Sequence, residues 1–106
     1  MIEDDAGVHP RHRLEELFYH PVRFSIMALL GASDEAEYSY ICTTVEVSKS
    51  VLSKQVALLE AAGYVNVRKG YLGKRPRTWI RATANGTDQF GRHLAALRDI
   101  AGALGS

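Results

Sequence analysis

The chain has 106 residues with 46% hydrophobic content, enough for one small domain that buries more than half of its extended surface. No apolar run reaches the roughly 20 residues that a membrane span needs, and the acidic N-terminus lacks the pattern of a signal peptide, so we expect a cytoplasmic protein. A single cysteine, Cys42, excludes an internal disulfide and any multi-thiolate metal site.

The net charge of +1 hides a dipolar distribution. Residues 1–47 carry nine acids against three arginines, a net charge of −6, whereas residues 48–83 carry eight cations against Glu60 alone, a net charge of +7. Charges act over about a Debye length, roughly 8 Å at physiological salt, so this clustering matters more for a polyanion than the total charge does. The alternative is a solvated charged face, but such faces usually intersperse acids with bases.

The N-terminal part of the chain predicts a tail followed by a helix. Residues 1–10 are polar and aperiodic, which is typical of a flexible segment. Leu14, Leu17 and Phe18 then fall at helical spacing on one face. We therefore expect a first helix over residues 11–19.

Three further helices are expected before the segment that is rich in β-branched residues. A proline at its first position starts the helix over residues 21–30. A polar connector over residues 33–37 leads to a short helix over residues 39–45. Ser48 then caps the N-terminus of a longer helix over residues 49–62, which a glycine closes in the left-handed conformation.

A β-hairpin and a last helix complete the chain. Residues 64–69 and 78–81 are rich in β-branched side chains and alternate between apolar and polar, which is typical of strands. Residues 70–76, with two glycines and a proline, link them as a long basic tip. The last helix covers residues 84–104 after an N-cap at Thr83. Its apolar residues repeat at spacings of four and three, which is typical of a coiled-coil-like contact. They are Phe90, Leu94, Leu97, Ala101 and Leu104.

The order of these elements is more informative than any single residue. A short helix, a tight turn, a longer helix and a basic hairpin follow one another in a winged helix-turn-helix. We therefore predict an α+β, mainly helical, single domain over residues 11–104, with a two-strand wing and dimerisation helices at both ends. The helix-turn-helix spans residues 38–62 and the wing spans residues 64–83.

In this fold the second helix of the motif enters the major groove of DNA and contacts base edges. Its outward polar face, opposite the apolar side, consists of Ser50, Ser53, Lys54 and Ala57. Hydroxyl groups hydrogen-bond several bases, lysine reaches guanine or phosphate, and alanine permits close approach or touches a thymine methyl. We expect Lys49, at the start of the helix, to bind phosphate.

The basic hairpin is expected to bind the DNA backbone or the flanking minor groove. The cations assigned to this role are Arg68, Lys74, Arg75 and Arg77. The alternative is a winged helix that serves as a protein-interaction module, whose outward face would be apolar or of mixed charge. The lysines of the longer helix and the acid-free hairpin favour DNA.

Several segments resemble ArsR/MarR-type winged-helix repressors. The sequence SKSVLSKQVALLEAAGYV over residues 48–65 resembles their recognition-helix signature, and residues 67–71, 75–79 and 83–86 resemble a short single-domain branch. The resemblance implies a homodimeric transcriptional regulator, most often a repressor, whose outer helices form the dimer. The interface residues are then Leu14, Leu17, Phe18, Phe90, Leu94, Leu97, Ala101 and Leu104. Two recognition helices would enter successive major grooves about 34–36 Å apart on a pseudo-palindromic operator.

Other classes of function find little support. The chain has no glycine-rich phosphate loop, no nucleophile elbow and no pair of acids placed to share a site, so we expect no enzymatic activity. ArsR-type metal sensors use paired cysteines or sets of histidines and acids, whereas Cys42 is alone and the four histidines are scattered, so we expect no metal or other cofactor. Two interpretations are open for the aromatic residues Tyr38, Tyr40, Tyr71 and Trp79. They either line a pocket for a small-molecule effector or, as is more common for aromatic residues at these spacings, belong to the core.

Overall fold

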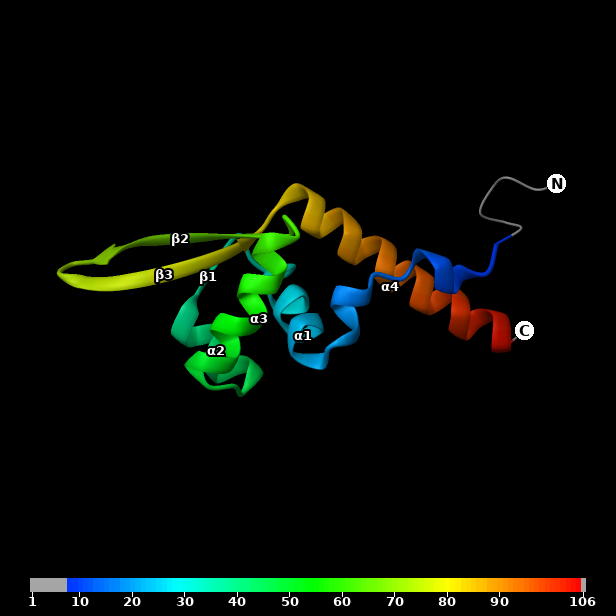
Figure 1. Cartoon of the computed structure of the whole chain (residues 1–106), viewed down its shortest axis with the longest axis horizontal. Helices are drawn as coiled ribbons and strands as arrows, with labels where there is room; N and C mark the ends of the chain where they lie inside the picture. The colour runs from blue at the N-terminus through cyan, green and yellow to red at the C-terminus, as the bar shows by residue number, and fades with distance from the viewer. Residues whose placement is uncertain (1–7, 106) are drawn as a thin grey trace.

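The computed structural model of the protein describes residues 8–105, with side chains through residue 102. Its α-helices are α1 (Pro21–Leu30), α2 (Tyr38–Val45), α3 (Lys49–Ala61) and α4 (Ala84–Gly105), and its strands are β1 (Ala36–Glu37), β2 (Val65–Leu72) and β3 (Arg75–Ala82) (Figure 1). Two 3-10 helices, η2 (Pro10–Arg13) and η3 (Glu16–Tyr19), precede them. The α+β, mainly helical prediction is confirmed. Of the predicted tail, residues 1–7 lie outside the described part, and Pro10 already begins η2.

Local sequence signals fix the helix-turn-helix. Ser48 is the N-cap of α3, where its hydroxyl oxygen accepts the backbone N–H of Val51 at 3.2 Å. Gly63, with φ +80°, ends α3 in the left-handed region. Glu46, with φ +63°, closes α2 in the same region without the freedom of glycine. The predicted bounds of α1 and α3 agree with the structure to within one residue.

The three strands form one antiparallel sheet in the order β1-β3-β2. The sequence predicts a polar connector over residues 33–37 and only two strands. In the structure Ala36 and Glu37 pair with the middle of β3 as a third strand. A strand of two residues has no alternation that a sequence pattern could reveal, and its place depends on the burial of Ala36, which is 5% exposed, against the core.

The hairpin turn is shorter than predicted. The sequence predicts a link over residues 70–76, whereas both strands continue until only Gly73 and Lys74 lie between them. Gly73 has φ +64°, which suits the first central residue of a two-residue hairpin turn. Pro76 is tolerated within β3 because β1 pairs only with residues 79 and 80, so the proline nitrogen can face solvent.

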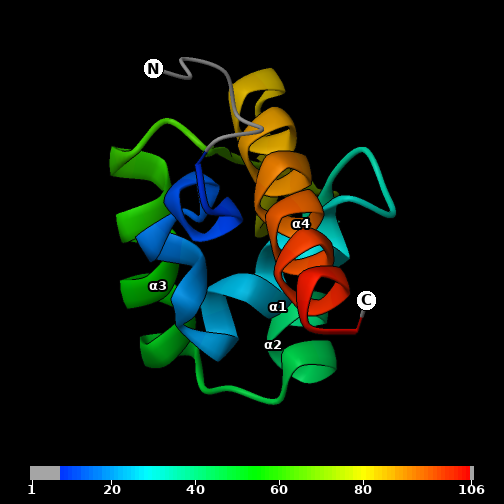
Figure 2. The same cartoon turned by 90° about the vertical axis from the view of Figure 1, so that its right-hand side faces the viewer.

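The N-terminal segment does not form the single helix predicted over residues 11–19. Extended backbone at Leu14 and Glu15 separates η2 from η3. The break arises because the N–H of Glu15 donates to Nδ1 of His93 in α4 at 3.0 Å, while its carboxylate accepts a nearby backbone N–H. Figure 2, which looks along the molecule from the end of α4, shows this segment lying beside that helix. A tertiary contact has therefore overridden the local helical period.

The first turn of α4 is fixed to the start of the hairpin. The hydroxyl of Thr83 accepts the N–H of Gly86 at 2.9 Å and donates to the carbonyl of Gly63 at 2.6 Å, so Thr83 is the predicted N-cap. Its backbone N–H donates to the carbonyl of Tyr64 at 3.0 Å. Gly86 is buried against the main chain of Tyr64, where a Cβ atom would lie 2.0 Å from the carbonyl oxygen. Only glycine fits there.

One hydrophobic core joins the helices to the sheet. Its largest fully buried side chains are Phe18, Ile26, Met27, Ile41, Leu52, Leu59, Val65 and Ile80. Phe18 packs edge-on against Phe90 with ring centroids 5.2 Å apart, which ties η3 to α4. The hairpin and the far half of α4 project from this core in opposite directions (Figure 1), and the molecule measures 61 × 24 × 21 Å.

A buried polar cluster holds the N-terminal segment to α4. His93 is 2% exposed and is surrounded by three aromatic rings, although in the sequence it is one of four scattered histidines. Burial lowers the pKa of His93, and the nearby Glu15 carboxylate opposes this effect only in part. The same carboxylate accepts a hydrogen bond from the hydroxyl of Tyr64. Burial and this bond raise the pKa of Tyr64 to about 12.

We expect the stability of the fold to fall in mild acid because of His93. Its pKa is lower in the folded state than its ordinary 6.5, so the unfolded chain binds the proton more readily. The stabilisation is therefore complete above pH 6.5 and is lost as pH falls toward the folded pKa. Thermal unfolding at pH 7.5 and 5.5 measures the loss, and His93→Asn, which keeps an acceptor for the Glu15 N–H, should reduce it. An equal loss in that variant would assign the effect to other groups.

Candidate nucleic-acid interface

The residues predicted to read bases share the outward side of α3. Ser50, Ser53, Lys54 and Ala57 are all exposed, as is Lys49 at the helix start. The opposite side of the helix is buried through Leu52, Val56 and Leu59, together with Gln55. The structure therefore brings the five predicted residues to one face that is open to a large partner.

Two polar contacts fix the rotation of α3 about its own axis. The hydroxyl of Tyr38 donates to the carbonyl of Lys49 at 2.9 Å and also contacts the hydroxyl of Ser53. On the buried side, the guanidinium of Arg23 donates to the side-chain oxygen of Gln55 at 2.6 Å. Ser53 is thus oriented before any ligand binds, with one hydrogen-bonding direction already used by Tyr38.

An open groove of about 560 Å³ separates α3 from the hairpin. Tyr38, Val56, Val67 and Thr78 are among its less exposed lining residues. More polar residues also line it, namely Glu37, Lys49, Ser53, Glu60, Lys69 and Arg77. The groove therefore carries both signs of charge, with three cations against two acids, and further exposed cations lie beyond it on α3 and at the hairpin turn.

Lys69 is a groove residue that the sequence-based assignment omitted from the DNA contacts. It lies on the face of β2 that also carries Val65 and Val67, because alternate residues of a strand share a face. That face looks toward α3, and Lys69 lines the groove together with Lys49 and Ser53. Its spacing from the two valines was the signal that could have identified it.

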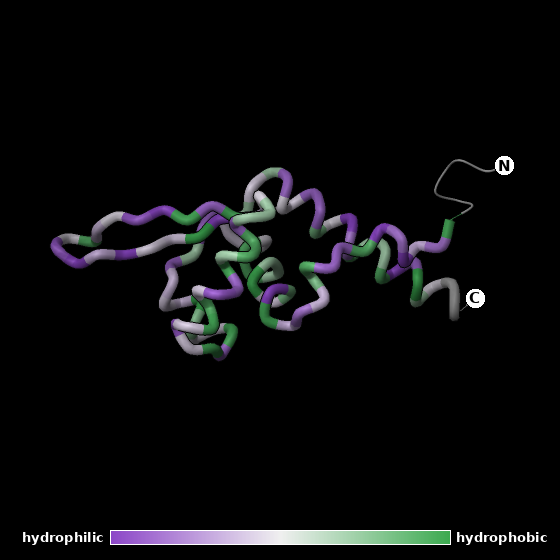
Figure 3. The backbone as a smooth tube through the Cα atoms, viewed as in Figure 1, coloured by the Kyte–Doolittle hydropathy of each residue, from purple (hydrophilic) through white to green (hydrophobic). Residues whose placement is uncertain are grey.

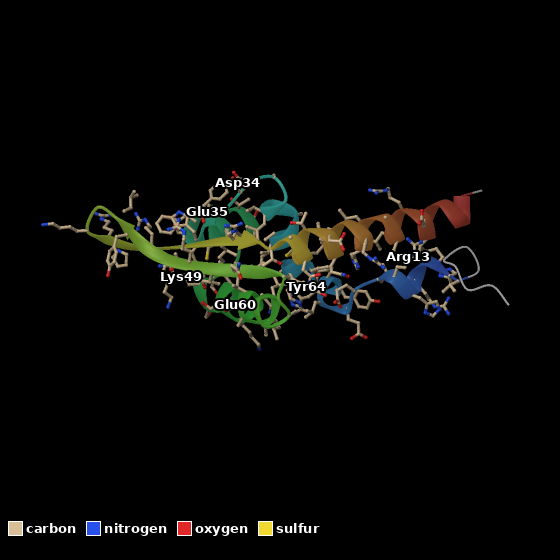
Figure 4. All side chains as sticks on the ribbon, turned by 90° about the horizontal axis from the view of Figure 1, so that it is seen from above. Arg13, Asp34, Glu35, Lys49, Glu60 and Tyr64 are labelled. Carbon is tan, nitrogen blue, oxygen red and sulfur yellow. The ribbon has the colours of Figure 1, made fainter. Side chains whose placement is uncertain are left out.

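Arg68 lies on the other face of the hairpin and has partners within the chain. Its guanidinium donates to the carboxylate of Glu35 at 2.6 and 3.3 Å, and its central carbon lies 4.2 Å from the ring centre of Trp79. The hydrogen bond from Arg68 lowers the pKa of Glu35. Figure 4 shows Glu35 on one side of the hairpin and Lys49 on the other. The structure therefore separates Arg68 from the reading face of α3.

Arg77 is also paired with an acid, at the edge of the groove. Its Nε atom lies 2.8 Å from Oε2 of Glu37, although the two groups are not aligned as a hydrogen bond. Glu37 belongs to β1, the strand that the sequence pattern does not predict. Arg77 thus has a carboxylate competing with any phosphate for its charge.

Cations without an ion-pair partner lie on α3, on β2 and at the turn of the hairpin. Within the described residues, no ion pair involves Lys49, Lys54, Lys69, Lys74 or Arg75. Lys74 and Arg75 are exposed at the turn of the hairpin, and no acid occurs between Glu60 and Asp88. Exposed cations without partners are those best able to exchange counterions for phosphate.

The residues predicted to form a dimer differ in how much surface they offer. Phe18 and Phe90 are 1% and 8% exposed within a single chain, so the prediction that they line a dimer interface does not agree with their place in the protomer core. Leu14, Leu17 and Leu94 are half-buried, the last two against the same core. Leu97, at 39% exposure, and Ala101 remain open, while the side chain of Leu104 lies outside the described part.

The remaining candidate sites show no shared cavity. Tyr38 lines the groove, but Tyr40 and Tyr71 are 58% and 73% exposed, so the expectation that these two belong to the core is wrong. Trp79 is half-buried beside Arg68. Among the described residues, no three His, Cys, Asp or Glu side chains are grouped to hold a metal ion. None of the described helices is long and apolar enough to cross a bilayer.

The helix-turn-helix, the projecting hairpin and the exposed face of α3 define the chain as a winged-helix protein. Residues 22–101 match the winged helix DNA-binding domain family, and the chain belongs to that family. Membership of this family and the likeness to a transcriptional regulator homologue support a DNA-binding transcriptional regulator. MarR-family structures share the fold.

Two solved structures and one further protein are similar to this chain in fold or sequence. A transcriptional regulator homologue from Pyrococcus horikoshii OT3 is 28% identical, with a TM-score of 0.79 over 85% of this chain and 89% of its own. A MarR-family regulator from Silicibacter pomeroyi shares the fold at 20% identity, with a TM-score of 0.61 over 93% and 68% of the two chains. An uncharacterised protein of Methanocaldococcus jannaschii is 27% identical over 74% of this chain and 86% of its own length.

Proposed function

We propose that the protein is a homodimeric, sequence-specific repressor that acts in the cytoplasm on a pseudo-palindromic operator. In each protomer α3 lies in the major groove, with Ser50, Lys54 and Ala57 toward base edges. Lys49 and Lys69 bind the phosphates beside them. The hairpin reaches the neighbouring stretch of duplex through Lys74 and Arg75.

The observation that carries this proposal is the common orientation of α3 and the hairpin. Lys49 of α3 and Lys69 of β2 line one groove as unpaired cations, and hydrogen bonds from Tyr38 and Arg23 hold α3 in place. A rigid reading helix flanked by phosphate-binding cations is what specific recognition of duplex DNA requires. Arg68 and Arg77 have weaker roles than the sequence suggested, since Glu35 and Glu37 compete for them.

Repression would follow from occupancy of the operator. A dimer with the seam of α4 at its centre places two copies of α3 on one side of the duplex, about 34–36 Å apart. Leu97 and Ala101 supply exposed apolar surface for that contact. A bound dimer would then block other proteins from the same stretch of DNA.

Salt titrations of DNA binding separate the two kinds of contact that we assign. Lys74→Ala and Arg75→Ala should weaken binding to tight-binding duplexes, selected from a random pool, and to unselected duplexes alike. Each lost phosphate contact should flatten the slope of log K against log salt by about 0.9. Lys54→Ala should instead weaken binding to the selected duplex by about 1–3 kcal/mol while sparing the unselected one.

Arg92→Ala is the matched control, because this exposed arginine lies on α4 away from the groove. It should leave both slopes unchanged. An equal loss on both duplexes for Lys54→Ala would make Lys54 a phosphate ligand. If the wild type bound no duplex at any salt, the proposal would give way to a winged helix that binds protein.

A further inference from the structure

The end of the hairpin carries two large apolar side chains that the fold leaves uncovered. Tyr71 and Leu72 are 73% and 63% exposed, the highest values among the exposed large hydrophobic residues of the described chain. They directly precede the Gly73–Lys74 turn, at the end of the hairpin that points away from the core (Figure 1). Figure 3 shows a hydrophobic stretch near this otherwise hydrophilic tip. No contact with the protein's own core accounts for it.

The two side chains occupy opposite faces of the hairpin. Tyr71 pairs with Pro76 across the strands, on the same face as Lys69, so it is directed to the side where α3 lies. Leu72 pairs with Arg75 on the other face. The tip is therefore apolar on both sides, with Lys74 and Arg75 at its end.

Charge decides which occupant fits this tip. The hairpin carries six cations and no acid, namely Arg68, Lys69, Lys74, Arg75, Arg77 and Arg81. A second copy of the hairpin would therefore repel it. The partner must combine dense negative charge with an apolar crevice. The minor groove of duplex DNA, about 6 Å wide, has sugar and base-edge walls between two rows of phosphates.

We propose that Tyr71 and Leu72 form a wedge that enters the DNA minor groove and partly unstacks one base step. Lys74 and Arg75 would bind the phosphates on either side. The inference rests on the proposed function, and it adds that the protein bends its DNA and favours easily unstacked pyrimidine–purine steps at the flank of the operator. Sequence preference would then extend to base pairs that α3 does not contact.

The test compares wild type with Tyr71→Ser/Leu72→Ser and with each single variant on tight-binding duplexes selected from a random pool. End-labelled duplexes report bending by energy transfer, and 2-aminopurine placed at successive flanking positions reports unstacking. The wild type should shorten the end-to-end distance and brighten one flanking position. The double variant should abolish both signals and weaken binding by about 10-fold, as expected for loss of one stacking contact. Its salt slope should stay unchanged because no charge is removed.

Tyr19→Ser is the matched control, because Tyr19 is 58% exposed but lies in η3, far along the chain from the hairpin. Unchanged thermal unfolding of the variants shows that the exposed serines leave the fold intact. A double variant that bends and brightens DNA as the wild type does overturns the wedge while leaving the proposed function in place. Loss of self-association instead of bending would also overturn it. A wild type that binds no duplex removes both proposals.

Discussion

Gly86→Ala is expected to destabilise the protein by about 3 kcal/mol or more, among the largest effects of any single substitution. The new methyl group would lie 2.0 Å from the carbonyl oxygen of Tyr64 and 2.8 Å from its carbonyl carbon. Both atoms belong to the main chain, so no side-chain rotation can relieve the overlap. The start of α4 must instead move away from the start of the hairpin, with loss of the Thr83 hydrogen bonds.

Thermal and guanidinium unfolding followed by circular dichroism measure this loss, which should lower Tm by roughly 12–20 °C. Gly91→Ala provides the control in the same helix. A Cβ atom at Gly91 meets nothing within 4 Å, so alanine should stabilise the protein by up to about 1 kcal/mol through helix propensity. Similar Tm values for the two variants would show that α4 does not approach Tyr64 so closely.

Leu97→Glu is expected to dissociate the proposed dimer. Burial of a leucine contributes about 1.5–3 kcal/mol, and a two-fold axis doubles it, so the dissociation constant should rise by about 100-fold or more. Leu97 is a better position than Leu94 for this substitution because its side chain is 39% exposed within one chain. Leu94 packs against the core, so a glutamate there would also unfold the protomer.

Sedimentation at micromolar concentration checks the result. Leu58→Glu, on the exposed flank of α3, replaces a leucine of nearly equal exposure, 42%, outside the α4 seam and should leave association unchanged. A wild type that sediments as a monomer contradicts the dimer. A Leu97→Glu variant that remains dimeric places the interface elsewhere.

The helical part of the fold could be predicted because its signals are local. A proline at residue 21, the Ser48 cap and the left-handed Gly63 each act within one turn of the helix they bound. Prediction failed where distant contacts decide the backbone. Glu15 interrupts the N-terminal helix because it donates to His93, 78 residues away, and β1 exists only because β3 provides an edge.

The outward face of α3 was predictable for the same reason, since the buried leucines determine which side remains. The partners of the wing arginines were not. Arg68 and Glu35 are 33 residues apart, and only the third strand brings the acids of this segment beside the hairpin. The apolar seam of α4 was assigned to a dimer interface because periodicity identifies an apolar stripe but not whether it packs against the same chain or against a second copy. The core of the same chain covers Phe90.

The junction at Thr83 connects the hairpin and α4 rigidly, so that the two elements move together. Thr83 joins β3 to α4 with no loop between them. Its hydrogen bonds to Gly63 and Tyr64, and the close approach of Gly86 to Tyr64, make this connection rigid. A tilt of α4 is therefore transmitted to the wing instead of being absorbed. In a body 61 Å long, a small rotation at one end becomes a large displacement at the other.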